Sequence, residues 1–294
     1  IIFLLIQRFT KIIILKLKLM KKINEEDINK SLSQVINNND DLFVIFSGIS
    51  SFGHKLIWQP SQIPAKILSC LMNFIGKKRT LILPTYTTDF ANTGRFDLEK
   101  THSINGALSD ETIKNSHFVR SSHPMYSYSI HGMLSNDLKK LNTTSAWGSN
   151  SVMSWLTKNN AKILILGVPW HTSCSILHHA EELIQVPYRY YKKFNGDFFI
   201  NGKFKSKCSE VVYSRSKNVD PIWDHTQIYS RLISKNKIFK SKNPYFPIES
   251  VNIKDYVDET LDMLSENPYA YIKNVTEVKN WVENSKKNEI NNEL

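Results

Sequence analysis

Cysteine and glycine are both scarce in this chain of 294 residues, and each scarcity limits the classes of protein it can belong to. The three cysteines (Cys70, Cys174 and Cys208) have no paired spacing, which excludes a disulfide framework and a CxxC zinc site and predicts a reducing, cytoplasmic location. The ten glycines form no GxxxxGK[ST] phosphate loop. No stripe of basic and aromatic residues is present either, so nucleic acid is not an expected partner.

No apolar stretch of the chain is both long enough and sufficiently free of charge to cross a bilayer. Residues 1–19 are apolar, but Arg8 and three lysines interrupt them, and the charges do not precede the apolar run as they do in a secretory signal. Met20 then opens a segment typical of a soluble start. We therefore expect residues 1–19 to be translated sequence upstream of the native start, and we expect no stable membrane anchor.

The formal net charge is +11, from 38 basic and 27 acidic residues. The chain is also rich in Lys, Asn and Ile, so a coding bias can account for the charge without any anionic partner. A basic surface would equally attract an anionic substrate or cofactor by long-range steering. Both interpretations stay open at the level of composition.

Strand-like and helix-like segments alternate along the chain, which predicts an α/β sandwich around a central sheet in one domain. No internal repeat or long linker divides it, and residues from Lys279 onward are polar enough to be frayed or disordered. Apolar runs bounded by turn residues predict strands, and periodic segments predict helices. The predicted strands are 42–46, 80–83, 126–130, 161–168 and 211–214, with a hairpin at 197–202; the predicted helices are 25–37, 64–75, 110–115, 150–158, 222–236 and 253–264.

The run from Ser175 to Glu182 carries the clearest chemical signal. On a helix, His178 and Glu181 share a face, so the carboxylate can bind one imidazole nitrogen and leave the other free as a general base. Three alternatives stay open: a structural histidine, a covalent route through Cys174, and a metal site. The metal site would use His178, His179, Glu181 and Glu182.

Two polar loops are further candidates for ligand contacts. Ser47 to Gly53 follows a predicted strand, and its small residues could offer amides to a phosphate or to pantetheine, although a plain turn explains the composition as well. Arg120 to Pro124 is a dense polar cluster in which the arginine could instead form a structural salt bridge.

Several segments, in order along residues 40 to 270, together resemble the aminoglycoside 3-N-acetyltransferase family and its relatives encoded with surface-polysaccharide genes. The order and spacing of these segments are more specific than any one alone. The matching segments are Asp41 to Gly53, Thr80 to Thr87, Phe96-Asp97 with Thr101, Ser103, Gly106 and Leu108, Arg120 to Ser127 with Gly132, Trp147 to Ser151, Ile165 to Val168, His178 to Glu181 (H-x-x-E) and Val186 to Arg189 (V-P-Y-R).

Four positions depart from the family pattern. Phe46 stands where the family usually has His, Gly48 where it has Ser, Arg79 where it has Gly, and Val152 where it has Pro. The first two affect individual cofactor contacts and leave the His178–Glu181 pair intact.

The resemblance implies a single-domain α/β fold with a central mixed sheet flanked by helices, distinct from the GNAT acetyltransferase fold. It assigns the domain to residues 20–275 and leaves 276–294 as a polar C-terminal tail. It also implies acetyl-CoA as co-substrate, no metal, and an amino-sugar acceptor. No oligomeric state is predicted.

The resemblance further implies roles for individual residues. His178 would act as the base, oriented by Glu181, with direct transfer through a tetrahedral intermediate. The expected cofactor contacts are Ser47, Gly48, Ile49, Ser50, Ser51, Thr85, His123 and Ser127. The expected substrate contacts are Tyr86, Asp89, Asp97, Glu182 and Asp224.

The acceptor is the open question. An enzyme evolved on polycationic aminoglycosides should present an acidic cleft, whereas this chain is basic overall. Our hypothesis is a less cationic amino sugar, nucleotide- or glycan-linked, in polysaccharide biosynthesis rather than antibiotic resistance. The alternatives are a non-catalytic acyl-CoA or sugar binder and a metal-dependent amidohydrolase acting on acylated sugars.

Overall fold

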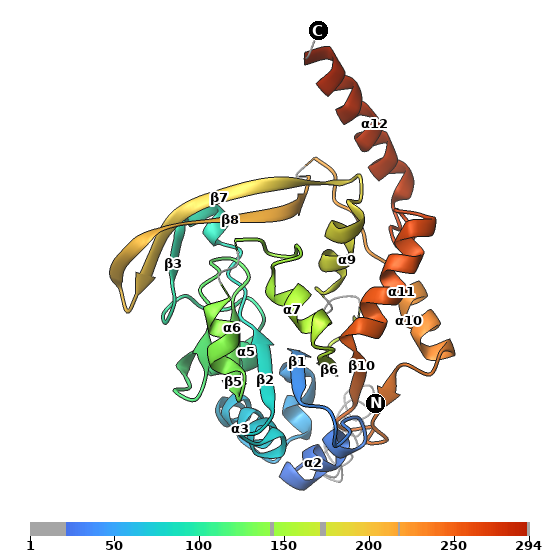
Figure 1. Cartoon of the computed structure of the whole chain (residues 1–294). Coiled ribbons are helices and arrows are strands. Elements are labelled where there is room, and N and C mark those ends of the chain that lie inside the picture. The colour runs from blue at the N-terminus through green and yellow to red at the C-terminus, as the bar shows by residue number, and fades with distance from the viewer. Residues whose placement is uncertain (1–21, 142–143, 171–174, 217, 293–294) are drawn as a thin grey trace, which may run out of the picture.

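The computed structural model describes residues 22–141, 144–170, 175–216 and 218–292, with side chains up to residue 285. Residues 1–19, expected to precede the native start, and Cys174 therefore lie outside the described residues. Two sheets organise the described part of the chain: a seven-stranded sheet and a three-stranded sheet that passes above it (Figure 1).

The larger sheet has the strand order β4-β5-β2-β1-β6-β10-β9. Its centre is parallel, because β1 pairs in parallel with both β2 and β6. The flanking pairs β2–β5, β4–β5, β6–β10 and β9–β10 are antiparallel. The expected single-domain α/β fold with a central mixed sheet is thus confirmed.

The strands and helices follow the predicted alternation, with short additional elements in both halves of the chain and a longer hairpin in the second half. Asn24 and Asp27 form a capping box at the start of α2, and Ser151 caps α7. The strands are β1 Leu42–Ser47, β2 Thr80–Pro84, β3 Arg95–Asp97, β4 Val119–Arg120, β5 Tyr128–Gly132, β6 Lys162–Leu166, β7 Arg189–Ile200, β8 Lys203–Arg215, β9 Phe239–Lys240 and β10 Ile248–Asn252. The helices are α2 Glu25–Ser33, α3 Ile63–Ile75, α4 Phe90–Thr93, α5 Ala107–Lys114, α6 Ser135–Lys140, α7 Val152–Lys158, α9 Leu177–Ile184, α10 Thr226–Ser234, α11 Ile253–Glu266 and α12 Val275–Asn292, with 3-10 helices η1 Ile49–Lys55 and η2 Pro60–Gln62.

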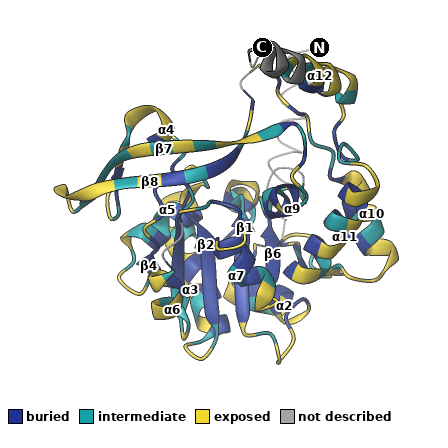
Figure 2. Cartoon of the chain, turned by 45° about the horizontal axis from the view of Figure 1, so that its top comes forward, coloured by how far each residue is buried: buried dark blue, intermediate teal, exposed yellow. Residues whose placement is uncertain are grey.

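Both faces of the central sheet are covered (Figure 2), which explains why its central strands β1 and β2 are mostly apolar. Successive side chains of a strand point to opposite faces. Val44 and Phe46 of β1 accordingly pack with α7, α9 and α11 in one cluster. Phe43 and Ile45 pack with α2 and α3 in a second cluster on the other face.

Strands β7 and β8 form a long antiparallel hairpin, here called the arm, which crosses above the ends of β1 and β2 (Figure 1). The predicted hairpin turn is confirmed, because Asn201 and Gly202 take φ of 53° and 81°, as such a turn requires. The strands are longer than predicted, since residues 211–214 form the end of β8 rather than a separate strand. The full length of the arm was not predicted, because lysines and aromatic residues are mixed along both strands and neither face shows the apolar pattern of a core strand.

The expectation of a frayed or disordered tail was wrong for the described part, where α12 is helical. Val278 and Val282 are buried and Trp281 packs against the core, so an apolar stripe anchors the first turns of an otherwise polar segment. Strand β10 was not predicted at all. It pairs antiparallel with β6, a partner distant in the sequence.

We predict that Gly132→Ala lowers the free energy of unfolding by about 2–4 kcal/mol, from backbone strain and overpacking. Gly132 has φ of +106°, and an added Cβ would lie 2.0 Å from the carbonyl oxygen of Arg79. Gly53→Ala is the matched control, because its Cβ would meet only the Ile63 side chain at 4.0 Å. Urea denaturation of both variants tests this, and equal stability of the two would contradict it.

Candidate active site

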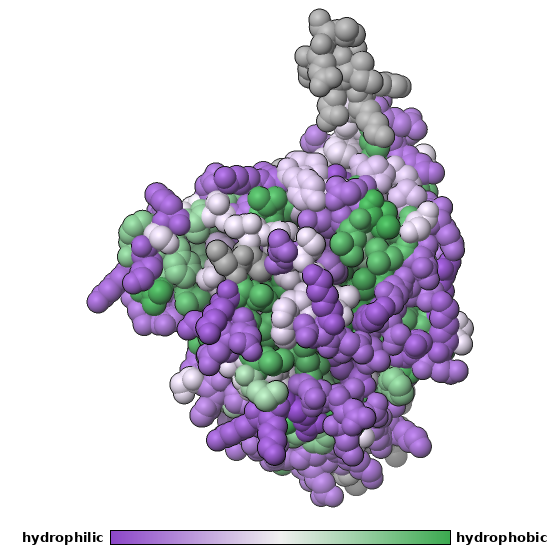
Figure 3. All heavy atoms as spheres, viewed as in Figure 1, coloured by the Kyte–Doolittle hydropathy of each residue, from purple (hydrophilic) through white to green (hydrophobic). Residues whose placement is uncertain are grey.

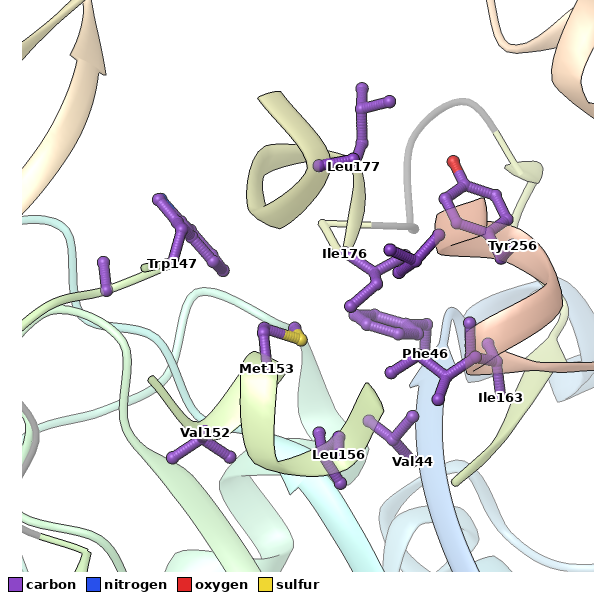
Figure 4. Packing of buried hydrophobic residues seen from close by; sticks show 14 of the residues in the cluster. Val44, Phe46, Trp147, Val152, Met153, Leu156, Ile163, Ile176, Leu177 and Tyr256 are labelled. Carbon is purple, nitrogen blue, oxygen red and sulfur yellow. The ribbon is translucent and has the colours of Figure 1, made fainter. Parts of the chain in front are cut away.

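The helix that carries the predicted base begins beside the carboxyl ends of the parallel strands. Figure 4 shows Phe46, near the end of β1, packed beside Ile176, which lies two residues before His178. Gly48 donates its amide to the Leu166 carbonyl at the end of β6, so the two strand exits lie together. This edge of an open α/β sheet is where ligands commonly bind.

His178 and Glu181 make the contact that their spacing predicts. The Nδ1 atom of His178 lies 2.6 Å from Oε2 of Glu181, one helical turn away. The Glu181 side chain is fully buried, whereas 24% of the His178 side chain is exposed. The imidazole can therefore reach solvent or a ligand while its partner cannot.

Three further side chains hold the Glu181 carboxylate. Tyr188 donates its hydroxyl to Oε1 at 2.9 Å, and the indole N–H of Trp223 donates to the same oxygen at 3.2 Å. The Nε atom of Arg189 lies 2.8 Å from Oε2. Burial alone would raise the pKa of Glu181, but Arg189, His178 and Trp223 outweigh it and hold the pKa at about 2.

The contacts of His178 fix which of its nitrogens is available. Nδ1 lies 2.6 Å from the Glu181 carboxylate and 2.8 Å from Nη2 of Arg189, but it cannot donate to the first and accept from the second at once. The carboxylate is ionised and has no bulk water around it, so the Nδ1–H donates to Glu181. The lone pair then sits on Nε2, as a general base requires.

Arg189 is a site residue that sequence reasoning missed, although it closes the V-P-Y-R segment. Only 5% of its side chain is exposed, and it donates to the Tyr213 carbonyl as well as pairing with Glu181. Arg189 is the first residue of β7, whereas its partner Glu181 lies on α9, so their contact does not follow from the spacing of residues on one helix.

We expect the acid limb of the pH profile to lie below pH 6.5. Burial, followed by the charge of Arg189, lowers the pKa of His178 from its ordinary value of 6.5, while Glu181 partly opposes this. Activity should therefore be lost only as pH falls through that lowered pKa, because Nε2 is then protonated. The measurement is kcat/KM for acetyl-CoA at saturating acceptor between about pH 5 and pH 8. An acid limb above pH 6.5 would contradict the assignment.

Two tryptophans enclose the imidazole. Trp147 and Trp223 meet it edge-on, with ring centroids at 5.3 Å and 5.7 Å. His179 bonds through Nδ1 to the Trp147 carbonyl, so it faces away from His178. Neither tryptophan was predicted as a site residue.

The serine loop expected to bind the cofactor lies at this edge, in the turn from β1 to η1. Ser50 and Ser51 are exposed, whereas Ser47 and Gly48 are half-buried and Ile49 is buried. Gly48 is sterically required, since a Cβ there would lie 2.4 Å from Val168. The amides of Gly48 and Ser51 bond within the protein, so they are not available to a ligand in this structure.

The side chains of the other expected cofactor contacts are buried and bond within the protein in this structure. Thr85 and Ser127 are fully buried, and their hydroxyls lie 3.1 Å apart. Both help to hold Arg120, which donates to Ser127 Oγ and to the carbonyls of Thr85, Leu98 and Thr101. His123 pairs with Glu210 of the arm at 2.7 Å. These polar residues fasten loops and the arm together.

Of the five expected substrate contacts, three are buried and two reach the surface. Asp97 is buried and accepts from the backbone amides of Gly202 and Glu99. Tyr86 is buried, and its hydroxyl bonds to those of Tyr128 and Ser175. Glu182 is buried against Gly148, and burial raises its pKa. The exposed Asp89 directly precedes α4. The fifth, Asp224, lines a cleft next to Trp223.

Two clefts lie near the enclosed imidazole. The first, here called the Trp cleft, has a volume of about 450 Å³ and is lined by Trp170, Trp223, Asp224 and Tyr229 among others. The second, the arm cleft, has about 480 Å³ and lies under the arm beside Tyr126, whose ring is 4.5 Å from Trp147. Figure 3 shows apolar side chains reaching the surface beneath the arm and beside α9 and α11, on a face that is otherwise mostly polar.

Neither a metal cluster nor a membrane span emerges from the described ranges. Within them, no three His, Cys, Asp or Glu side chains are grouped so as to hold a metal ion. The helices among the same residues include none with the length and apolarity that a bilayer crossing needs.

Comparison with known proteins points in one direction. A family model described as aminoglycoside 3-N-acetyltransferase matches residues 49–263. No curated protein matches the chain. Among solved structures, AAC-IIIb in a binary complex with CoASH is 18% identical with a TM-score of 0.69, covering 84% of this chain and 97% of that one.

Two further structures are similarly related. The aminoglycoside acetyltransferase AAC(3)-Xa is 17% identical with a TM-score of 0.68, covering 83% of this chain and 93% of its own. The YokD protein from Bacillus subtilis is 14% identical with a TM-score of 0.67, covering 84% and 95%. At these identities the likeness establishes a shared fold.

Proposed function

Since the chain belongs to the aminoglycoside 3-N-acetyltransferase family and is thus an acyltransferase that uses acetyl-CoA, we propose that it acetylates an amine of an amino sugar with His178 as the general base. The observation that carries this proposal is the 2.6 Å contact between His178 Nδ1 and the buried carboxylate of Glu181. It leaves the second imidazole nitrogen available at the partly exposed side of the ring.

The reaction needs a base because a sugar amine is largely protonated near neutral pH and cannot then attack a thioester. Nε2 of His178 removes the proton, the amine nitrogen bonds to the thioester carbon, and the carbon–sulfur bond breaks. The proton on His178 then passes to the departing sulfur, which leaves as the CoA thiol. Glu181 stabilises the imidazolium between these steps.

We place the phosphate-bearing end of the donor in the arm cleft. Lys192 and Arg215 line it, the latter paired with Asp220, together with the rings of Tyr126, Tyr190 and Phe194. Cations and aromatic rings are what a nucleotide with several phosphate charges requires. The exposed serines of the loop after β1 are then proposed to contact the pantetheine. AAC-IIIb has been solved with CoASH, which supports CoA as the common ligand.

The test is acceptor-dependent release of thiol from acetyl-CoA, with mass spectrometry of the acetylated sugar. The panel contains D-glucosamine, a nucleotide-linked monoamino sugar and kanamycin. Thiol release with at least one of them is expected. Binding of CoA without release from any acceptor would favour the non-catalytic alternative.

A nucleotide- or glycan-linked acceptor remains the second candidate, and the charge of the arm favours it. Between Arg189 and Arg215 the arm carries seven basic residues and two acidic ones. Such a surface attracts anionic ligands. Higher kcat/KM for the nucleotide-linked sugar than for D-glucosamine would support this acceptor.

A further inference from the structure

The Trp cleft has rigid aromatic walls. The indole N–H of Trp170 donates to Glu249, and its ring stacks on Tyr256 with centroids 6.1 Å apart and lies 5.5 Å from Tyr229. Trp223 is held by its bond to Glu181 and lies against the guanidinium of Arg189 at 5.6 Å. Fixed rings of this kind offer a flat surface on which the C–H face of a sugar ring can pack.

One indole ring separates the cleft from the proposed base. Trp223 lines the cleft and at the same time contacts the imidazole of His178 edge-on at 5.7 Å. A sugar packed on this tryptophan would therefore be one indole ring away from the imidazole. The arm cleft is one ring further away, because Trp147 stands between Tyr126 and His178.

The charges in the Trp cleft nearly cancel. Its carboxylate is that of Asp224, which accepts a hydrogen bond from the backbone amide of Thr226 and lies 3.9 Å from the ammonium of Lys273. The neighbouring Glu249 is bonded to Trp170, Tyr229 and Lys240. Residues 171–174, which the structure does not describe, contain no Asp or Glu in the sequence.

A cleft of this kind discriminates among acceptors by their charge. Removing an ammonium from water is costly unless a carboxylate pairs with it. One amine can be neutralised by deprotonation at His178, but the remaining ammonium groups of a polycation would each need a partner. We propose that the Trp cleft binds an amino sugar carrying a single amine, stacked on Trp170 and Trp223; this inference rests on the proposed function.

The first experiment compares acceptors and the two clefts. Wild-type protein should show kcat/KM at least about tenfold higher for D-glucosamine or a nucleotide-linked monoamino sugar than for kanamycin. Trp170→Ala should raise the KM of the monoamino acceptor about tenfold with little change in the KM of acetyl-CoA. Lys192→Ala, in the arm cleft, should instead raise the KM of acetyl-CoA about tenfold with little change in the KM of the monoamino acceptor. The exposed Lys254→Ala is the neutral control.

The second experiment changes the charge of the cleft. Lys273→Glu leaves Asp224 without its counter-charge and should shift the kcat/KM ratio about tenfold toward kanamycin. The variant lies on an exposed side chain, so folding should be preserved. No shift in the ratio, or a wild-type preference for kanamycin, would overturn the inference even with acetyl transfer intact.

Binding separates this inference from the proposed function. Titration with D-glucosamine should change the tryptophan fluorescence of the wild type, and Trp170→Ala should abolish that change. If binding persists without thiol release, the proposed reaction fails and the sugar cleft stands. Turnover that is insensitive to Trp170→Ala overturns the cleft assignment alone. If the protein shows no sugar binding and no turnover, both the cleft assignment and the proposed reaction are overturned.

Discussion

His178→Ala is expected to lower kcat for acetyl transfer by about 10²–10⁴-fold, the usual contribution of a positioned general base. The remaining residues would still bind the donor and acceptor, but the amine would have to lose its proton to solvent. The measurement is steady-state thiol release, with CoA affinity measured separately by calorimetry. CoA affinity should change little, because the imidazole acts on the acceptor amine.

His102→Ala is the matched control for this variant. Its side chain is 77% exposed and lies 3.2 Å from the carboxylate of Asp110. It should keep full activity. Turnover of His178→Ala at the level of the control would show that another group removes the proton and would end the assignment of the base.

Glu181→Ala should lower the free energy of unfolding by about 3–5 kcal/mol and also impair acetyl transfer. The substitution leaves Arg189, only 5% exposed, as a buried cation without its carboxylate. It also removes the acceptor of the Tyr188 hydroxyl. Urea denaturation measures the loss of stability.

Glu266→Ala provides the comparison, because Glu266 pairs with Arg231 at the surface and is 69% exposed. A pair of this kind contributes less than about 1 kcal/mol. If both variants were equally stable, the buried cluster would not contribute as argued here.

The contribution of Glu181 should also depend on pH in one direction. Its pKa in the folded protein is about 2, against an ordinary value of 4.5, so the folded state binds its proton less readily. The stabilisation is therefore complete above about pH 4.5 and is lost as pH falls toward 2. Glu181→Gln should remove this part of the acid dependence.

The centre of the sheet could be predicted because the apolar run of each central strand identifies it without knowledge of its pairing partner. Residues 42–46 are apolar throughout, and 161–168 are apolar apart from Lys162, as expected of strands covered on both faces. The contact of His178 with Glu181 was equally local, since it depends only on helical spacing. Strand β10 could not be predicted because its partner β6 is far away in the sequence, and the arm was predicted too short because its lysines and aromatic residues alternate without an apolar pattern.

The roles of polar side chains were harder to predict. Thr85, Ser127 and Asp97 stand in the family's motifs, but the sequence does not distinguish a hydroxyl or carboxylate that contacts a ligand from one that bonds to Arg120 or to Gly202. That difference depends on burial, which only the fold decides. Arg189 was overlooked for the same reason, since its charge acts on α9 from another element.

The arm is fastened to the body at several points along its length: near its base by Arg189, midway by the contact of Glu210 with His123, and at its tip by the bond from Gly202 to Asp97. An arm held at these three places is not free to move as a hinged lid. We therefore infer that motion of the arm does not gate product release.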